Sequence, residues 1–349
     1  MIEFSQVFID QLVIHHIGCK AQGEPVKFSR TPYQMQNDDA VGELLINYFF
    51  RPFKSEAFFH FAHDEDVSLN EAYRLALQLF DEPLSFLEVS VKLAERLYEA
   101  SNHAMIRGGE FYMVLFRNVV VDGEVTDGLG IFKSETKETF LKVYLKDQNF
   151  ELGAQEGINV KRLDKGCIIF NTEREQGLKV CSIDNVNKGN EARFWRDDFL
   201  GLKPREDNYY YTNNYMKMCR EFIGEVFNAE NRVPKADQID ILNRSVDYFN
   251  KKDNFSEDDF AHEVIRQPEA ISAFNQFKEF YEAEQECPLP SEFDISKSAV
   301  KGEKKFFKSI LKLDKNFHVY IHGKKNYIER GFDNEKGLNF YKLFFEQES

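Results

Sequence analysis

Two histidines and three carboxylates stand close together in the segment HFAHDEDVS. His60 and His63 precede Asp64, Glu65 and Asp66, and imidazole and carboxylate groups are ligand types that divalent metals prefer. The spacing matches neither a zinc motif nor an EF-hand loop, and an acidic run of this kind is also typical of a solvated loop before a helix. The sequence therefore predicts no metal site, and a metal-dependent enzyme acting on nucleic acid is kept as an alternative.

Other candidates for catalysis are isolated residues. Cys19 follows His15 and His16, and a Cys-His pair can be nucleophilic, but one sequence-adjacent pair is far more typical of a partly buried free thiol. Gly128 and Gly130 lack the third glycine and the lysine of nucleotide-binding loops. The sequence contains no GxSxG, HExxH, P-loop or kinase signature. We therefore expect a protein without enzymatic activity and without a cofactor.

Lysines gather near the carboxyl end in the segment KGEKKFFKSILKLDKNFHVYIHGKK. Nine lysines from Lys297 to Lys325 face only two carboxylates, Glu303 and Asp314, which gives this stretch a net charge of +7. The whole chain has a net charge of −14, so the remainder carries −21. An acidic protein is repelled by DNA at long range. A local positive patch can still bind DNA, because the Debye length is only about 8 Å at physiological salt.

Alternating residues in KFFKSILKLD predict a strand with a lysine-rich face. Lysines two residues apart on a strand lie about 6.6 Å apart, and each can meet a phosphate as a point charge without reading sequence. The alternative is an edge strand that lysines protect against aggregation. The candidate nucleic-acid-binding residues are Lys301, Lys304, Lys305, Lys308, Lys324 and Lys325.

Composition indicates a globular, intracellular protein. Hydrophobic residues make up 42% of the 349 residues, and 35 phenylalanines are available for a core. The five cysteines form no CxxC pair, which favours reduced thiols. No apolar run is long enough to span a membrane, and the start MIEFSQVFIDQ lacks the positive region of a signal peptide. We expect a cytoplasmic protein that does not bind membranes.

Pattern and turn signals predict an α+β fold with an antiparallel sheet, a helical middle region and a small β-rich C-terminal unit. Residues 110–183 are typical of an antiparallel meander of about five strands, with a hairpin turn at Asp122-Gly123. A helical array follows from about Arg193, in which Ser256 caps one helix and Pro268 opens another. The predicted domains are 1–190 (α+β), 191–287 (helical) and 288–349 (β-rich with a basic face).

Several segments in this order resemble the bacterial NdpA-type nucleoid-associated proteins. These segments are VFIDQLVIHHIG, GINVKRLDKGCIIFN, WRDDFLG, FNQFKEFYEAEQECPLPSEFDISKSAVKGEKKFFKSI, FHVYIHG and YIERGFDNEKGLNFYKLF. The resemblance covers nearly the whole chain. It implies a bacterial cytoplasmic protein associated with the nucleoid, without known catalytic residues or cofactor. The acidity of this chain departs from what a DNA-coating protein requires.

The leading hypothesis is a nonspecific DNA-binding protein that contacts phosphates through the six candidate lysines. Such binding weakens steeply with salt, because each neutralised phosphate releases counterions. The alternative is a protein-interaction scaffold that a nucleoid partner recruits without direct DNA contact. A homodimer is compatible with either hypothesis.

Overall fold

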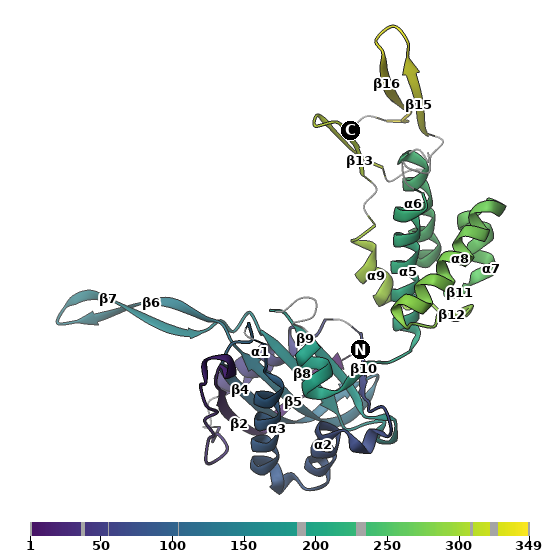
Figure 1. The fold of residues 1–349 in the computed structure, drawn as a ribbon. Coiled ribbons are helices and arrows are strands. Elements are labelled where there is room, and N and C mark those ends of the chain that lie inside the picture. The colour runs from purple at the N-terminus through teal and green to yellow at the C-terminus, as the bar shows by residue number, and fades with distance from the viewer. Residues whose placement is uncertain are drawn as a thin grey trace. The chain divides into compact units, whose positions relative to one another are not determined.

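A computed structural model describes residues 2–35, 39–54, 56–103, 105–186, 193–227, 235–307, 310–321 and 327–347. The chain divides into two compact units, residues 1–205 and 206–349. Helices and antiparallel sheets are both present, which confirms the α+β class expected from the sequence (Figure 1). The finer division into three domains stays a prediction.

The first unit is built on one large antiparallel sheet, in which eight strands are joined among the described residues. The strand order is β1-β4-β5-β8-β9-β3-β10, and β2 also pairs with β4. The strands are β1 (Ile2–Glu3), β2 (Phe8–Ile17), β3 (Phe59–Phe61), β4 (Gly109–Val121), β5 (Glu124–Ser134), β8 (Lys165–Phe170), β9 (Lys179–Asp184) and β10 (Leu202–Pro204). Consecutive antiparallel pairing of β4, β5, β8 and β9 gives a meander of four strands, where the sequence predicts about five. The run at residues 137–146, expected within the meander, instead leaves the sheet and pairs with residues 149–158, for which no strand was predicted.

The turn between β4 and β5 lies at Asp122-Gly123, as predicted. Asp122 has a φ of 51° and Gly123 a φ of 85°. A two-residue hairpin turn with right-handed strand twist requires this left-handed backbone, which glycine adopts without steric cost and aspartate tolerates. The carboxylate of Asp122 also accepts a hydrogen bond from the ammonium group of Lys179 on β9.

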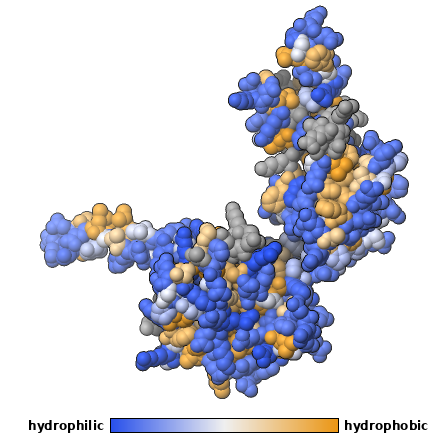
Figure 2. All heavy atoms as spheres, viewed as in Figure 1, coloured by the Kyte–Doolittle hydropathy of each residue, from blue (hydrophilic) through white to orange (hydrophobic). Residues whose placement is uncertain are grey.

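Between β5 and β8 the chain leaves the large sheet and forms a separate two-stranded ribbon. This ribbon, called the arm from here on, consists of β6 (Lys137–Lys146) and β7 (Asn149–Ile158). It projects from the first unit in Figure 1, and apolar side chains gather along it in Figure 2. At its root, Nζ of Lys137 lies 2.9 Å from a carboxylate oxygen of Glu110 on β4, which ties the arm to the sheet.

Helices cover both faces of the large sheet. On one face, α2 (Glu71–Asp81) and α3 (Phe86–Ala100) share a core with Met113 of β4, and on the other, α1 (Asp39–Phe50) shares a core with Val114. Successive residues of a strand point to opposite faces, so β4 contributes to both cores. Phe49 of α1 stacks on Phe132 of β5 with ring centroids 4.1 Å apart.

The second unit begins with a helical array whose inward faces form an aromatic core, including Tyr215, Phe222 and Phe255. Ser256 caps its short helix by accepting a hydrogen bond from the N–H of Asp259, and Pro268 opens the next helix, as predicted. The helices are α5 (Asn208–Glu225), α6 (Lys235–Lys251), α7 (Glu257–Phe260), the π-helical η6 (Ala261–Ile265), α8 (Pro268–Gln285) and α9 (Lys297–Lys304). Across the described part of the chain, every helix is too short or too polar to traverse a bilayer.

Pairs of strands complete the second unit, and the last two of these pairs are hairpins that give it the expected β-rich C-terminal part. Their strands are β11 (Asn254–Ser256) with β12 (Glu292–Asp294), β13 (Ile310–Leu313) with β14 (Phe317–Tyr320), and β15 (Ile328–Asp333) with β16 (Leu338–Leu343). All three pairs are antiparallel.

Candidate nucleic-acid interface

Lys301, Lys304 and Lys305, called the α9 lysines from here on, lie on a helix and at its end. The strand predicted for Lys304 and Lys305 is wrong, because α9 runs to Lys304 and the strand begins only at Ile310. Ser296 caps the helix, its hydroxyl accepting a hydrogen bond from the N–H three residues further on. The cap and a buried helical face together determine the conformation here, and the alternating sequence pattern does not.

The inward side of α9 fixes the direction of the α9 lysines. Ala299, Val300 and Glu303 are 0%, 2% and 7% exposed, and α9 packs against α5 and α6. Residues three and four apart share one side of a helix, with Cβ atoms about 5–6 Å apart. All three α9 lysines are exposed, so the helix gathers them on the side opposite the buried residues.

Glu303, the carboxylate nearest to these lysines in the sequence, faces the helical core. Its Oε2 lies 3.2 Å from Nη1 of Arg220 on α5. The guanidinium of Arg220 also lies over the ring of Phe306, 5.4 Å from the centroid. The negative charge of Glu303 is thus paired with an arginine and does not neutralise the α9 lysines.

Within the described residues, no carboxylate oxygen lies within 4 Å of the Nζ atom of any α9 lysine. Nζ of Lys305 lies over the ring of Phe306, 4.9 Å from its centroid. Lys297, at the start of the same helix, already has partners within the protein. Its Nζ lies 3.2 Å from Asp253 and donates to the backbone carbonyl of Asn250. Lys297 is therefore a structural cation, whereas the α9 lysines are available to an anion from solution.

The other candidates, Lys308, Lys324 and Lys325, lie outside the described residues, so their part in the cluster stays a prediction. The next described lysines are Lys312 on β13 and Lys315 in the turn after it, and both are exposed.

The position of the α9 lysines also stabilises the helix itself. Lys301 and Lys304 stand in the last turn of α9, where cations interact favourably with the negative end of the helix dipole by about 0.3–1 kcal/mol each. This interaction needs no ligand, so the location of these residues alone does not establish a binding site.

A second group of cations, which the sequence reasoning missed, surrounds a hollow of about 210 Å³ beside α6. Its lining residues are Arg244, Asp247, Tyr248, Lys251, Lys252, Glu263, Val264 and Arg266. The available signal was the spacing of seven and eight residues from Arg244 to Lys251, at the end of α6, and to Lys252, just after it.

The cations of this hollow already have partners. Nζ of Lys251 lies 2.9 Å from Asp247, and Nζ of Lys252 lies 2.7 Å from Glu263. Burial lowers the pKa of Arg244, and the carboxylate of Asp240, 3.1 Å from its Nε, acts in the opposite direction. Because its lysines already pair with carboxylates, the hollow offers less unpaired positive charge than the exposed side of α9 does.

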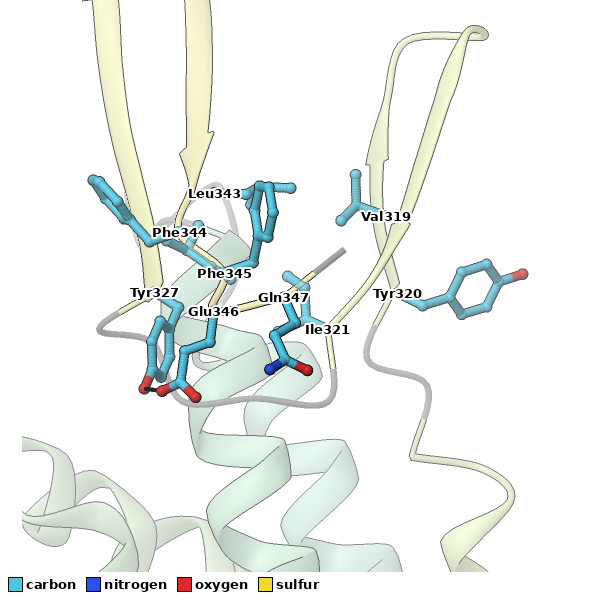
Figure 3. Close-up of a pocket in the computed structure, with 10 residues that line it drawn as sticks. Val319, Tyr320, Ile321, Tyr327, Leu343, Phe344, Phe345, Glu346 and Gln347 are labelled. Atoms are coloured by element: carbon cyan, nitrogen blue, oxygen red, sulfur yellow. Dashed lines mark hydrogen bonds between the residues drawn. The ribbon is translucent and has the colours of Figure 1, made fainter. Parts of the chain in front are cut away.

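An apolar hollow of about 470 Å³ lies among the C-terminal hairpins (Figure 3). It is lined by Val319, Tyr320, Ile321, Tyr327, Ile328, Leu343, Phe344, Phe345, Glu346 and Gln347. The hydroxyl of Tyr327 donates to Glu346, 3.5 Å away. Among these lining residues the one charged group is a carboxylate, so the hollow suits an apolar segment of a partner and disfavours phosphate.

The residues first considered for metal binding and catalysis do not form a site in the described part of the chain. His60 lies half-buried on β3, and His63 is exposed in the loop that follows. No group of three or more His, Cys, Asp and Glu residues suited to a metal occurs among the described residues. The thiol of Cys19 is buried and donates to the carbonyl of Ile106, 3.6 Å away.

Comparison with known proteins identifies the family. No curated protein matches the chain. A family described as nucleoid-associated protein YejK matches residues 13–337, which is nearly the full length and confirms the resemblance seen in the sequence. The chain therefore belongs to the YejK family of nucleoid-associated proteins.

Proposed function

We propose that the chain binds DNA without sequence preference, through contacts between lysine ammonium groups and backbone phosphates. The observation that carries the proposal is the exposed side of α9, where the α9 lysines have no carboxylate within 4 Å among the described residues. Lys308, Lys324 and Lys325 complete the proposed cluster. Membership of a nucleoid-associated family supports a role at the nucleoid.

Lysine suits binding that ignores base sequence. Its ammonium group is a point charge that meets phosphate from many directions, whereas base readout uses planar side chains such as arginine in the major groove. The segment from Lys297 to Lys325 contains no arginine. The expected contacts are therefore with the phosphate backbone. We also propose that the protein has no enzymatic activity. Its proposed place of action is the nucleoid in the cytoplasm.

The acidic bulk of the chain makes the binding dependent on salt. A net charge of −14 repels DNA at long range. At contact, local lysines dominate because charges further away than about 8 Å are screened at physiological salt. If about five lysines engage, the slope of log affinity against log salt concentration is about −4 to −5.

The test measures fluorescence anisotropy of the purified chain with labelled duplex and single-stranded DNA across a salt series. Replacing Lys304 and Lys305 by glutamate is expected to abolish binding at physiological salt. At low salt, where residual binding is measurable, the slope should become shallower by about 2, because two phosphate contacts are lost.

A matched control is the Lys251→Glu, Lys252→Glu variant, which makes the same charge change in the same unit. Those lysines already pair with carboxylates, so this variant should bind nearly as the wild type does. Equal loss of affinity in both variants, or none in the first, would show that the α9 lysines are not the contact.

A second candidate function is a scaffold that a nucleoid protein recruits. The apolar hollow among the C-terminal hairpins favours it, because such a surface fits a protein segment. This candidate predicts no DNA binding by the purified chain even at low salt, together with a protein that co-purifies with it. Replacing Phe345 by aspartate should then release that protein, whereas the Lys304→Glu, Lys305→Glu variant should retain it.

A further inference from the structure

The arm exposes an apolar surface that its own unit does not cover. Its two strands pair residue by residue from Lys137 opposite Ile158 to Lys146 opposite Asn149. Ten residues of antiparallel strand span about 34 Å. A two-stranded ribbon alone is marginally stable in water, and additional strands or a helix on its apolar face are needed to stabilise it.

One face of the arm is apolar toward its tip. Alternation along the paired strands places six apolar side chains together on that face. These residues, called the apolar arm face, are Leu141, Val143, Leu145, Phe150, Leu152 and Ala154. Val143 stands directly opposite Leu152 at the centre, and these two side chains are 61% and 70% exposed. Phe150, near the tip, is 79% exposed.

On the opposite face of the arm the aromatic side chains are partly covered within the ribbon, since Phe140 and Tyr144 are 44% and 39% exposed. The ring of Phe140 lies over Gly157, and the ring of Tyr144 lies over Gly153. The hydroxyl of Tyr144 also donates to Glu151, 3.2 Å away. Glycines beneath aromatic rings are a way to cover apolar surface within a ribbon. The apolar arm face has no comparable cover among the described residues.

Charge argues against a nucleic acid or a membrane on this face. The arm, residues 137–158, carries three lysines against four carboxylates, Glu138, Asp147, Glu151 and Glu156. Nucleic acids and anionic membrane surfaces both attract basic segments. A nearly neutral, apolar ribbon instead fits a protein surface that is itself apolar and nearly uncharged.

We propose that the apolar arm face binds the same face of a second copy of the chain and forms a homodimer. In a two-fold arrangement both copies contribute the same patch, so each apolar side chain meets another apolar side chain. Two ribbons packed face to face form a four-stranded sandwich with sheets about 10 Å apart, which supplies the layer that each ribbon lacks.

The area is sufficient for a reversible dimer. A buried aliphatic side chain contributes roughly 100 Å² of apolar surface and an aromatic one more, so the patch buries about 500–600 Å² per copy. The pair then buries somewhat more than about 1,000 Å², the lower limit for a specific interface. The arm extends beyond the large sheet of its unit (Figure 1), so the arms of two copies can meet without contact between their sheets.

The test uses two single-cysteine additions to the full chain, Val143→Cys and Lys142→Cys. These neighbours lie on opposite faces of the same exposed strand, and all five native cysteines are buried. Sedimentation velocity should show the 41.0 kDa wild-type chain shifting toward twice that mass as its concentration rises through the micromolar range. A short bis-maleimide should cross-link Val143→Cys into dimers efficiently and Lys142→Cys at least about tenfold less, since only position 143 lies in the interface.

Val143→Glu gives a second, independent measurement. Its side chain is exposed in the single chain, so the substitution empties no core, and the thermal unfolding midpoint at low protein concentration should match that of the wild type. The variant should sediment as a monomer throughout the concentration range. Three results would overturn the proposal: a wild-type monomer at every concentration, a dimer that survives Val143→Glu, or equal cross-linking from the two cysteine positions. None of these readouts involves DNA, so the outcome is independent of the lysine proposal.

Discussion

Two lysines and a glutamate lie without access to water in the sheet of the first unit. The side chains of Lys133 and Lys165 are 0% exposed and that of Glu135 is 1% exposed. One carboxylate oxygen of Glu135 lies 2.9 Å from Nζ of Lys133 and 2.7 Å from Nζ of Lys165. Burial lowers the pKa of Lys133, and pairing with Glu135 opposes that effect. Nζ of Lys133 also donates to the backbone carbonyl of Arg107, and Nζ of Lys165 lies 3.9 Å from a carboxylate oxygen of Asp184. Glu135 is thus the anion that both cations share.

Glu135→Gln is expected to destabilise the protein strongly. The substitution keeps the shape of the side chain but leaves two buried ammonium groups without the anion between them. Breaking a buried ion pair by removing one partner costs about 3–5 kcal/mol. Urea unfolding of the purified chain, followed by circular dichroism, measures the change in the free energy of unfolding.

Glu151→Gln on the arm is the matched control for this measurement. Glu151 pairs with Lys146 at 3.4 Å, but the two side chains are 42% and 59% exposed. Exposed pairs contribute at most about 1 kcal/mol, so this variant should unfold nearly as the wild type does. If Glu135→Gln were equally harmless, the buried triad would not contribute to stability.

At the scale of single helices, strands and turns, the sequence predicts those features that depend on residues close together in the chain. The Asp122-Gly123 turn and the Ser256 cap depend on residues within a few positions of each other, and both are confirmed. The strand at Lys304 and Lys305 is wrong because contacts with α5 decide between helix and strand there. Val300 lies in the core that α5 contributes to, and Glu303, three residues further on, is buried beside Arg220 of α5. The pattern of the segment KFFKSILKLD does not reveal these contacts.

The candidate site was predictable in composition but not in geometry. The lysines were identified by their number in a short stretch, and the strand expectation placed Lys304 and Lys305 on opposite faces. The helix brings these two onto the exposed side with Lys301 instead. Glu303 contacts Arg220, which lies 83 positions away in the chain. No pattern in the sequence indicates this contact.

Substitutions at Gly302 test the helical conformation of α9 experimentally. Gly302 lies inside α9, and the nearest atom to an added Cβ is the hydroxyl of Tyr209 at 3.9 Å, which leaves ordinary room. Alanine is the best helix former, so Gly302→Ala should raise the free energy of unfolding by about 0.5–1 kcal/mol. Valine is a poorer helix former and a better strand former, so Gly302→Val should raise the free energy of unfolding by less than Gly302→Ala does. Urea unfolding of both variants gives the order of stability, and a more stable valine variant would contradict the helix.

At the scale of the whole molecule, the two proposals place function on separate units. The α9 lysines belong to residues 206–349 and the arm to residues 1–205. On these proposals each copy of an acidic chain offers the α9 lysines as a small cationic surface, and such a surface alone binds DNA weakly at physiological salt. A dimer offers two cationic surfaces, so that binding of the second becomes an intramolecular step with a higher effective concentration.

Dimerisation through the arm should therefore strengthen binding to long DNA in particular. Val143→Glu leaves every lysine in place, and on a long duplex it should lower affinity by at least about tenfold, because the second contact is no longer linked to the first. On a duplex of one helical turn, which accepts a single lysine cluster, the affinities of variant and wild type should agree. Anisotropy titrations on the two lengths, at protein concentrations where the wild type sediments as a dimer, measure the difference. Equal affinity of the variant and the wild type for the long duplex would mean that the two clusters of a dimer do not engage one DNA molecule together.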